Sequence, residues 1–169
     1  MKKLIFMFLV MTTVIFADKN EDFLEAVENN KMVQAQLLLK LGADLEAKDQ
    51  WFEKTPLMIA ASKNNVEMLE FLVNKGAKLE TKNKDGFTAL LWAVWTNSNR
   101  AAEYLINKGA KLDNKTKSGD TILHLAVLQN NTNLISLFTK KSIDLELKDA
   151  KGRTALLIAL ENEKEDLIE

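Results

Sequence analysis

Apolar residues along this chain form short clusters at helical spacing, separated by polar stretches rich in Lys, Asp and Gly. In the segment 66–74, for example, positions 66, 68, 69 and 71–73 are apolar. This spacing is typical of an amphipathic helix with one buried face. Polar stretches such as 82–86 predict turns. We therefore expect an all-α protein of short helices joined by turns.

The clusters recur with a fixed period. A Thr-x-Leu triplet begins every 33 residues, at Thr55, Thr88, Thr121 and Thr154, and an Ala follows each Thr by five residues. A Gly-Ala pair recurs at 42, 76 and 109, and Leu followed by an acidic residue recurs at 45, 79, 112 and 145. Three landmarks with one shared period indicate a repeat protein. One extra residue in the first interval falls in the segment 49–54.

Each repeat has a simple physical interpretation. Its Thr hydroxyl can accept a hydrogen bond from a free amide in the first turn of a helix, so the Thr predicts a helix start. Asn tolerates the left-handed backbone that ends a helix, which places the ends of the first helices at Asn30, Asn64, Asn97 and Asn130. A second helix follows in each repeat, and Gly76 and Gly109 end two of these helices.

The stretches 83–91, 116–124 and 149–157 contain Gly-x-Thr-x-Leu at one register. In this the sequence resembles the ankyrin repeat family over residues 21–169. The resemblance implies a solenoid of helix-turn-helix units with protruding β-turn or hairpin loops. It also implies a protein-binding role, without naming the partner. We divide the chain into an N-terminal capping repeat (18–48), three repeats (49–82, 83–115, 116–148) and a C-terminal partial or capping repeat (149–169).

Two places depart from the repeat pattern. Ser142-Ile143 stands where the other repeats have Gly-Ala, which predicts a softer turn, since a non-Gly residue in a left-handed turn costs on the order of 1 kcal/mol. The acidic and basic residues of 161–166 predict a polar outer face that suits a terminal cap.

The first seventeen residues do not follow the repeat pattern. Lys2 and Lys3 precede an apolar stretch, 4–16, and Ala17 precedes an abrupt polar switch at 18–22. This layout predicts a secretory signal peptide over 1–17, and therefore an exported protein in the periplasm or outside the cell. The alternative is an uncleaved segment that tethers a structural scaffold to the membrane. The chain contains no Cys, so packing rather than disulfides must stabilise the exported fold.

The charge balance excludes one class of partner. The chain has 23 basic and 24 acidic residues, and loss of 1–17 would leave 21 and 24. Because no basic excess exists to neutralise phosphates, we expect no nucleic-acid partner. After signal cleavage we also expect no membrane contact, and a monomer.

The sequence offers no candidate for catalysis or for metal or cofactor binding. His124 is the only His and lies three residues after Thr121, where a structural hydrogen bond at the helix start is expected. One His without Cys does not suggest zinc, and no Gly-x-Ser-x-Gly or Gly-rich phosphate loop is present. We therefore expect a protein that is not an enzyme and needs no cofactor.

Aromatic residues mark the candidate binding surface. Ankyrin proteins use their turn tips and the exposed face of their first helices for recognition, and large apolar residues here fall on those positions. The predicted protein-binding residues are Trp51, Phe52, Lys54, Lys63, Lys84, Asp85, Phe87, Trp95, Asp120 and Leu128. Aromatic side chains with a charged rim are typical of an interface centre. The alternative is that Phe87 and Trp95 pack on each other and only cover the groove, with Trp92 in the core.

Overall fold

A computed structural model describes residues 18–141 and 143–162. Three expectations concern residues outside this part of the chain: the signal peptide 1–17, the soft turn at Ser142, and the polar cap residues after 162. The predictions for these residues are therefore untested.

The described residues fold into helices without strands, which confirms the all-α prediction. The helices are α2 (Lys19–Glu28), α3 (Met32–Lys40), α4 (Pro56–Ser62), α5 (Val66–Asn74), α6 (Ala89–Trp95), α7 (Asn99–Asn107), α8 (Ile122–Leu128), α9 (Thr132–Thr139) and α10 (Ala155–Glu161).

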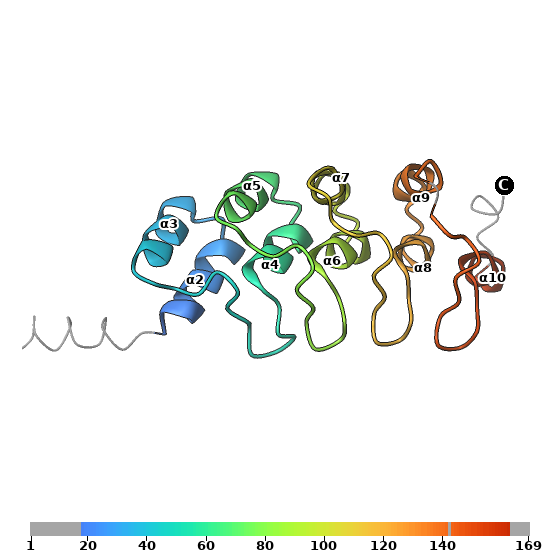
Figure 1. Cartoon of the computed structure of the whole chain (residues 1–169), viewed down its shortest axis with the longest axis horizontal. Coiled ribbons are helices and arrows are strands. Elements are labelled where there is room, and N and C mark those ends of the chain that lie inside the picture. The colour runs from blue at the N-terminus through green and yellow to red at the C-terminus, as the bar shows by residue number, and fades with distance from the viewer. Residues whose placement is uncertain (1–17, 142, 163–169) are drawn as a thin grey trace, which may run out of the picture.

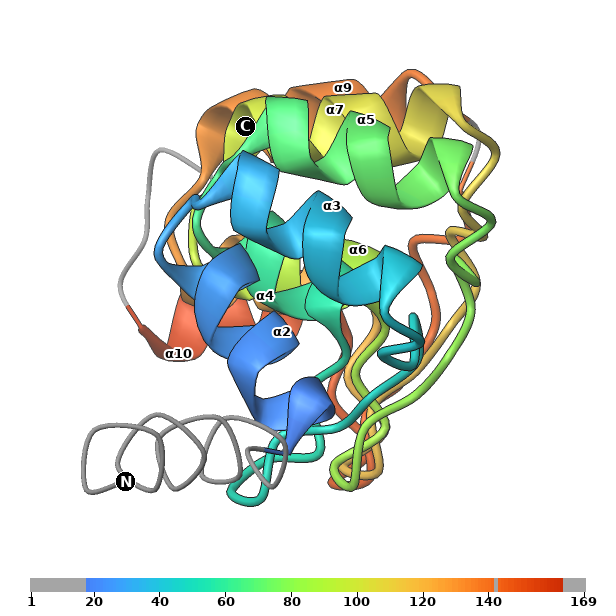
Figure 2. The same ribbon diagram turned by 90° about the vertical axis from the view of Figure 1, so that its left-hand side faces the viewer.

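The helices form two layers of a linear stack. The first helices of the repeats, α2, α4, α6, α8 and α10, lie side by side in one layer, and the second helices form the other (Figure 1). The turns that connect successive repeats project beyond the first layer, all at the same side of the stack (Figure 2). This is a solenoid of helix-turn-helix units with protruding turns.

The helix boundaries lie where the sequence predicts them. The hydroxyl oxygens of Thr55, Thr88, Thr121 and Thr154 each accept the backbone N–H three residues later, at 3.3–3.4 Å. The four Asn residues at the ends of the first helices all have φ between 54 and 56°. A Thr start and a left-handed Asn end therefore fix α4, α6 and α8 at seven residues each, and α10, which also starts at a Thr cap, has the same length.

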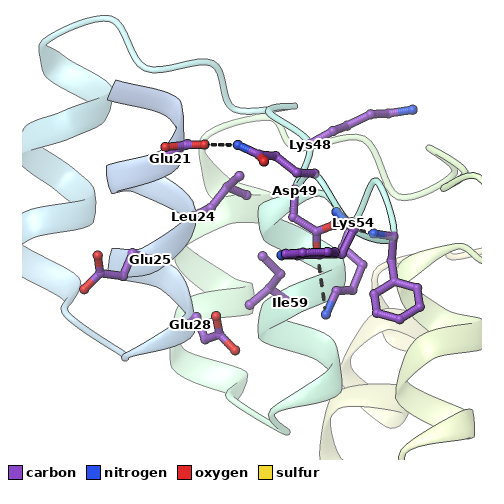
Figure 3. A pocket seen from close by; sticks show the side chains of 11 residues that line it. Glu21, Leu24, Glu25, Glu28, Lys48, Asp49, Lys54 and Ile59 are labelled. Carbon is purple, nitrogen blue, oxygen red and sulfur yellow. Dashed lines mark hydrogen bonds and ion pairs between the residues drawn. The ribbon is translucent and has the colours of Figure 1, made fainter. Parts of the chain in front are cut away.

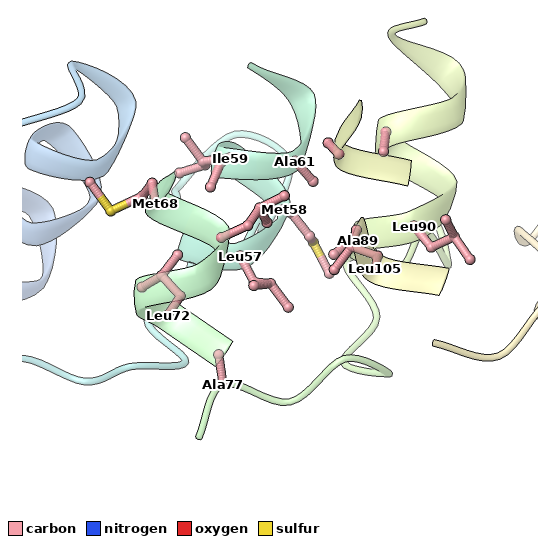
Figure 4. Close-up of a cluster of buried hydrophobic side chains, with 14 of the residues drawn as sticks. Leu57, Met58, Ile59, Ala61, Met68, Leu72, Ala77, Ala89, Leu90 and Leu105 are labelled. Carbon is pink, nitrogen blue, oxygen red and sulfur yellow. The ribbon is translucent and has the colours of Figure 1, made fainter. Parts of the chain in front are cut away.

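Small and large apolar residues alternate in the core between the layers. Ala60, Ala93 and Ala126 are fully buried where first helices approach each other. Leu57, Leu72 and Leu105 fill the space between the layers in the second and third repeats (Figure 4). Because each first helix is apolar on the sides that face its neighbours, the stack buries one continuous cluster from α2 to α9.

The projecting turns are short hairpins joined to one another. Each closes on a backbone hydrogen bond, as from the N–H of Asn83 to the oxygen of Phe87 at 3.0 Å, and the last three turns have a second one, as from the N–H of Gly86 to the oxygen of Asn83 at 3.1 Å. Neighbouring turns are linked by bonds from the N–H of Lys117 to the oxygen of Asp85 at 2.8 Å, and from Ala150 to Ser118 at 2.9 Å. These links are possible because Gly86 and Gly119 sit at the crossings; a Cβ at Gly86 would lie 2.8 Å from the nitrogen of Lys117.

Candidate protein-binding surface

Four aromatic rings from two neighbouring repeats form one connected group, which we name the aromatic cluster: Phe52, Phe87, Trp92 and Trp95. The ring centroids of Phe87 and Trp92 are 5.0 Å apart. Phe52 meets Trp92 edge-on at 6.2 Å, and Trp95 meets Phe87 edge-on at 6.3 Å. Such geometries are favourable for aromatic pairs and hold the rings in fixed positions.

The aromatic cluster is only partly covered by the protein. Phe52 and Trp95 are 46% and 40% exposed, and Trp51, beside the cluster, is 78% exposed. The alternative prediction was correct that Phe87 and Trp95 touch, but their contact leaves an apolar surface open to solvent. Exposed apolar surface of this kind is typical of an interaction site.

Trp92 is the ring that connects the two repeats, and the sequence analysis did not include it among the binding residues. It contacts both Phe52 and Phe87 from the first helix of the third repeat, and it packs on the buried core. Its indole N–H is buried without a hydrogen-bond partner in the described part of the chain. The spacing of three residues to Trp95, which places both indoles on one face of α6, was the signal that could have identified it.

Two lysines lie against the faces of these rings. The Nζ of Lys54 is 5.5 Å from the centroid of Phe52 and 5.4 Å from that of Trp92. The Nζ of Lys84 is 5.1 Å from Phe52 and donates a hydrogen bond to the carbonyl oxygen of Trp51. Cation–π contacts of this kind are worth about 0.5–1 kcal/mol at exposed sites. The lysines therefore frame the aromatic cluster, as the sequence predicts for a charged rim.

Trp51 borders an open hollow of about 410 Å³ between its turn and α2 (Figure 3). Leu24 and Ile59, both buried, lie at the hollow, and Glu21, Glu25 and Glu28 line it from one face of α2. Three of the lining carboxylates already have partners: Glu21 accepts from Gln50, Glu25 pairs with Lys31 at 3.4 Å, and Glu28 pairs with Lys63 at 3.3 Å.

The remaining predicted residues lie around the cluster rather than in it. Lys63, which follows α4, is exposed and held by Glu28. Asp85 is exposed at the tip of the third repeat. Asp120 is half-buried and accepts the hydroxyl of Thr116 at 3.2 Å, so its own turn uses its carboxylate. Leu128 is exposed at the end of α8.

His124 has the structural role that its position predicts. It is 1% exposed, and its Nδ1 accepts the backbone N–H of Thr121 at 3.3 Å. Its Nε2 donates to the carbonyl oxygen of Arg153 at 2.9 Å, in the next turn. Both ring nitrogens are thus used in joining two repeats, and neither faces solvent as a catalytic base would.

Asp149 accepts hydrogen bonds from Lys151 and Arg153 and forms an ion pair with Arg153. Burial alone would raise the pKa of its carboxyl. The backbone N–H groups of Arg153 and Lys151, together with the side chain and charge of Arg153, lower that pKa more, and the net result is a pKa below the usual value. The Arg153 guanidinium lies 2.7 Å from the carboxylate. This cluster closes the last turn and belongs to the fold.

In residues 18–141 and 143–162, no group of three or more His, Asp or Glu side chains could hold a metal ion. None of the helices in this part of the chain combines the length and the hydropathy needed to span a bilayer.

Comparison with known proteins identifies the family. The model of ankyrin repeats (3 copies) matches residues 23–116 and 110–169, which together cover most of the chain. This protein therefore belongs to the ankyrin repeat family, and members of that family generally mediate protein–protein interaction and are generally not enzymes.

The curated relatives share only part of their length with this chain. A putative ankyrin repeat protein of Borreliella burgdorferi is 29% identical over 80 residues, which are 47% of this chain and 35% of that protein. Putative ankyrin repeat protein FPV244 of fowlpox virus is 34% identical over 41% of this chain and 10% of its own length. Glycerophosphocholine phosphodiesterase gde1 of Schizosaccharomyces pombe is 36% identical over 78 residues, which are 46% of this chain and 7% of that enzyme.

Proposed function

We propose that this protein is an exported, non-catalytic binding module, acting in the periplasm or outside the cell. Its recognition surface is the aromatic cluster together with Trp51, Lys54 and Lys84. The observation that carries the proposal is that rings from two repeats are held in fixed contact and still exposed. Proteins rarely leave connected aromatic surface uncovered unless a partner covers it.

The rigidity of this surface favours binding. Phe52 and Phe87 come from neighbouring turns that a hydrogen bond from the Asn83 side chain to the oxygen of Phe52 ties together at 3.0 Å. Trp92 and Trp95 come from a helix whose start is capped. Because these groups are ordered before binding, association with a partner would cost little conformational entropy.

Affinity capture from the exported fraction tests the proposal. We expect the wild-type chain to retain a protein partner that the pair Trp51→Ala/Trp95→Ala loses, since both residues are exposed and their removal leaves the core intact. A control pair, Val33→Ala/Leu37→Ala, removes exposed apolar residues of α3 and should retain the partner. Equal capture by both pairs would end the case for the aromatic cluster.

The mature N-terminus distinguishes the two forms of the proposal. Mass spectrometry of the purified protein should find Asp18 as its first residue if residues 1–17 are a signal peptide. Retention of residues 1–17 would replace the exported module by the alternative, a scaffold tethered to the membrane.

A further inference from the structure

Lysines gather on one edge of the stack, which we name the return edge. It comprises the segments 40–48, 74–82, 107–115 and 140–148. Their described residues, which are all but residue 142, run from the second helices down to the projecting turns and lie side by side in Figure 2. These four segments contain eleven Lys and six acidic residues, a formal charge of +5, in a chain whose formal net charge is −1. Charge in this protein is therefore segregated, although the totals nearly balance.

The lysines recur in rows because the repeat recurs. Lys75, Lys108 and Lys141 occupy one repeat position, Lys78 and Lys111 a second, and Lys82, Lys115 and Lys148 a third. All are exposed except Lys115, which is half-buried. Neighbouring packed helices are about 8–10 Å apart, so each row places an ammonium group at about that interval along the stack.

Two of the six acidic residues of the return edge, Glu46 and Glu80, bond to the next repeat and not to the lysine ammonium groups. Both carboxylate oxygens of Glu46 accept hydrogen bonds from the next repeat, from the N–H of Lys78 at 2.9 Å and the hydroxyl of Thr81 at 2.6 Å. Glu80 repeats the arrangement with Lys111 and Asn114. Among the described residues, the only ion pair that includes a lysine of the return edge is Lys48–Glu53, at 3.0 Å. Most of these ammonium groups are therefore left for an external anion.

We propose that the return edge binds an extended acidic segment of a protein partner. An extended chain in the polyproline II conformation advances about 3.1 Å per residue with three residues per turn, so about three residues span one repeat and every third side chain points the same way. Acidic side chains at every third position would then meet successive lysines of one row. The four segments contain no Phe, Trp or Tyr, and the two rings that their lysines contact, Phe71 and Tyr104, are half-buried, which favours a peptide over single-stranded nucleic acid, whose bases need open rings for stacking. This surface is separate from the aromatic cluster and goes beyond the proposed function.

Titration of the purified chain with synthetic peptides tests this proposal. The probe is a 12-residue peptide with Glu at every third position, and the same peptide with Lys in place of Glu is the negative probe. At low salt we expect the Glu peptide alone to bind. The affinity should fall steeply as salt rises, since exposed charges are screened.

A matched pair of variants locates the binding. Lys78→Gln/Lys111→Gln/Lys148→Gln removes three charges of the return edge and should weaken Glu-peptide binding by about tenfold or more. Lys31→Gln/Lys63→Gln/Arg100→Gln removes the same charge from the opposite edge and should change it by less than about twofold. Circular dichroism checks that both variants remain folded.

Several outcomes would overturn the proposal. It fails if the Glu peptide does not bind at low salt, or if the two triple variants weaken binding equally, because net charge alone would then explain it. It also fails if a single-stranded oligonucleotide or vesicles with anionic lipid bind more tightly than the peptide. The Trp51→Ala/Trp95→Ala variant should bind the Glu peptide normally. Failure of the return-edge proposal would therefore not contradict the proposal for the aromatic cluster, and failure of the cluster proposal would not contradict the return edge.

Discussion

Leu90 and Leu156 occupy the same position in two repeats but lie in opposite environments. Each is two residues after the Thr that starts a first helix, Leu90 in α6 and Leu156 in α10. Leu90 is 1% exposed and Leu156 is 53% exposed. The difference arises because α8 covers that side of α6, whereas no described residue covers the same side of α10.

This contrast shows that burial in a stack is decided by the neighbour and not by the residue. Leu123 and Leu156 are the same residue type at the same repeat position, and Leu123 is buried because Ala155, Ile158 and Ala159 pack against it. Stability should therefore depend on the interfaces between repeats, and equivalent substitutions should have unequal effects along the chain.

The largest expected effect is the difference between Leu90→Ala and Leu156→Ala. Leu90→Ala removes a fully buried side chain between repeats and should lower the free energy of unfolding by about 3 kcal/mol. Leu156→Ala should cost less than about 1 kcal/mol, because the side chain is already half in water. Urea unfolding followed by circular dichroism gives both values. Equal losses would show that burial is not decided by the neighbour.

His124→Ala should have an intermediate effect. It removes a buried ring and its hydrogen bonds, including the one to the oxygen of Arg153, which then keeps only the N–H of Asp149, and this should cost about 2 kcal/mol. Because His124 links the fourth repeat to the last turn, hydrogen exchange should accelerate most in residues 149–162. Uniform acceleration across all repeats would contradict this local role.

Asp149→Asn should have the smallest effect, and that effect should depend on pH. The lowered pKa of Asp149 means that its ionised form stabilises the fold above about pH 4 and that this contribution is lost as the pH falls through the lowered pKa. The variant should melt below the wild type at pH 7, and the two melting temperatures should converge as the pH falls through the lowered pKa of Asp149. A constant difference as the pH falls would mean that hydrogen bonding, and not charge, is responsible.

Most of the fold could be predicted because the same local signals occur in each repeat. Thr88 starts a helix and Asn97 ends it for reasons contained within a few residues, and the period of 33 then gives the order of the units. The exposure of Leu156 could not be predicted in this way. Its sequence context matches that of Leu90, and only the presence of a covering helix separates them.

Most residues of the candidate site could be predicted from the sequence, but the contacts between them could not. Trp51, Phe52, Phe87 and Trp95 were identified because they are apolar at positions that are usually polar. The spacing of Trp92 and Trp95 places both on one face of α6, but the contact of Trp92 with Phe52 depends on how the second and third repeats pack. Asp120, predicted as a binding residue, instead uses its carboxylate to accept the hydroxyl of Thr116 in its own turn.

The turn of the second repeat is joined to its neighbour differently from the others. Its links run through the side chains of Asn83 and Lys84, whereas the later turns are linked from backbone to backbone. A flexible side chain tolerates a shift that a direct backbone link does not, and this is the turn that contains the additional residue and Trp51. The molecule can therefore vary the length and contents of this one loop while the register of the following loops stays the same, which makes it the natural place for its specificity to diverge or be redesigned.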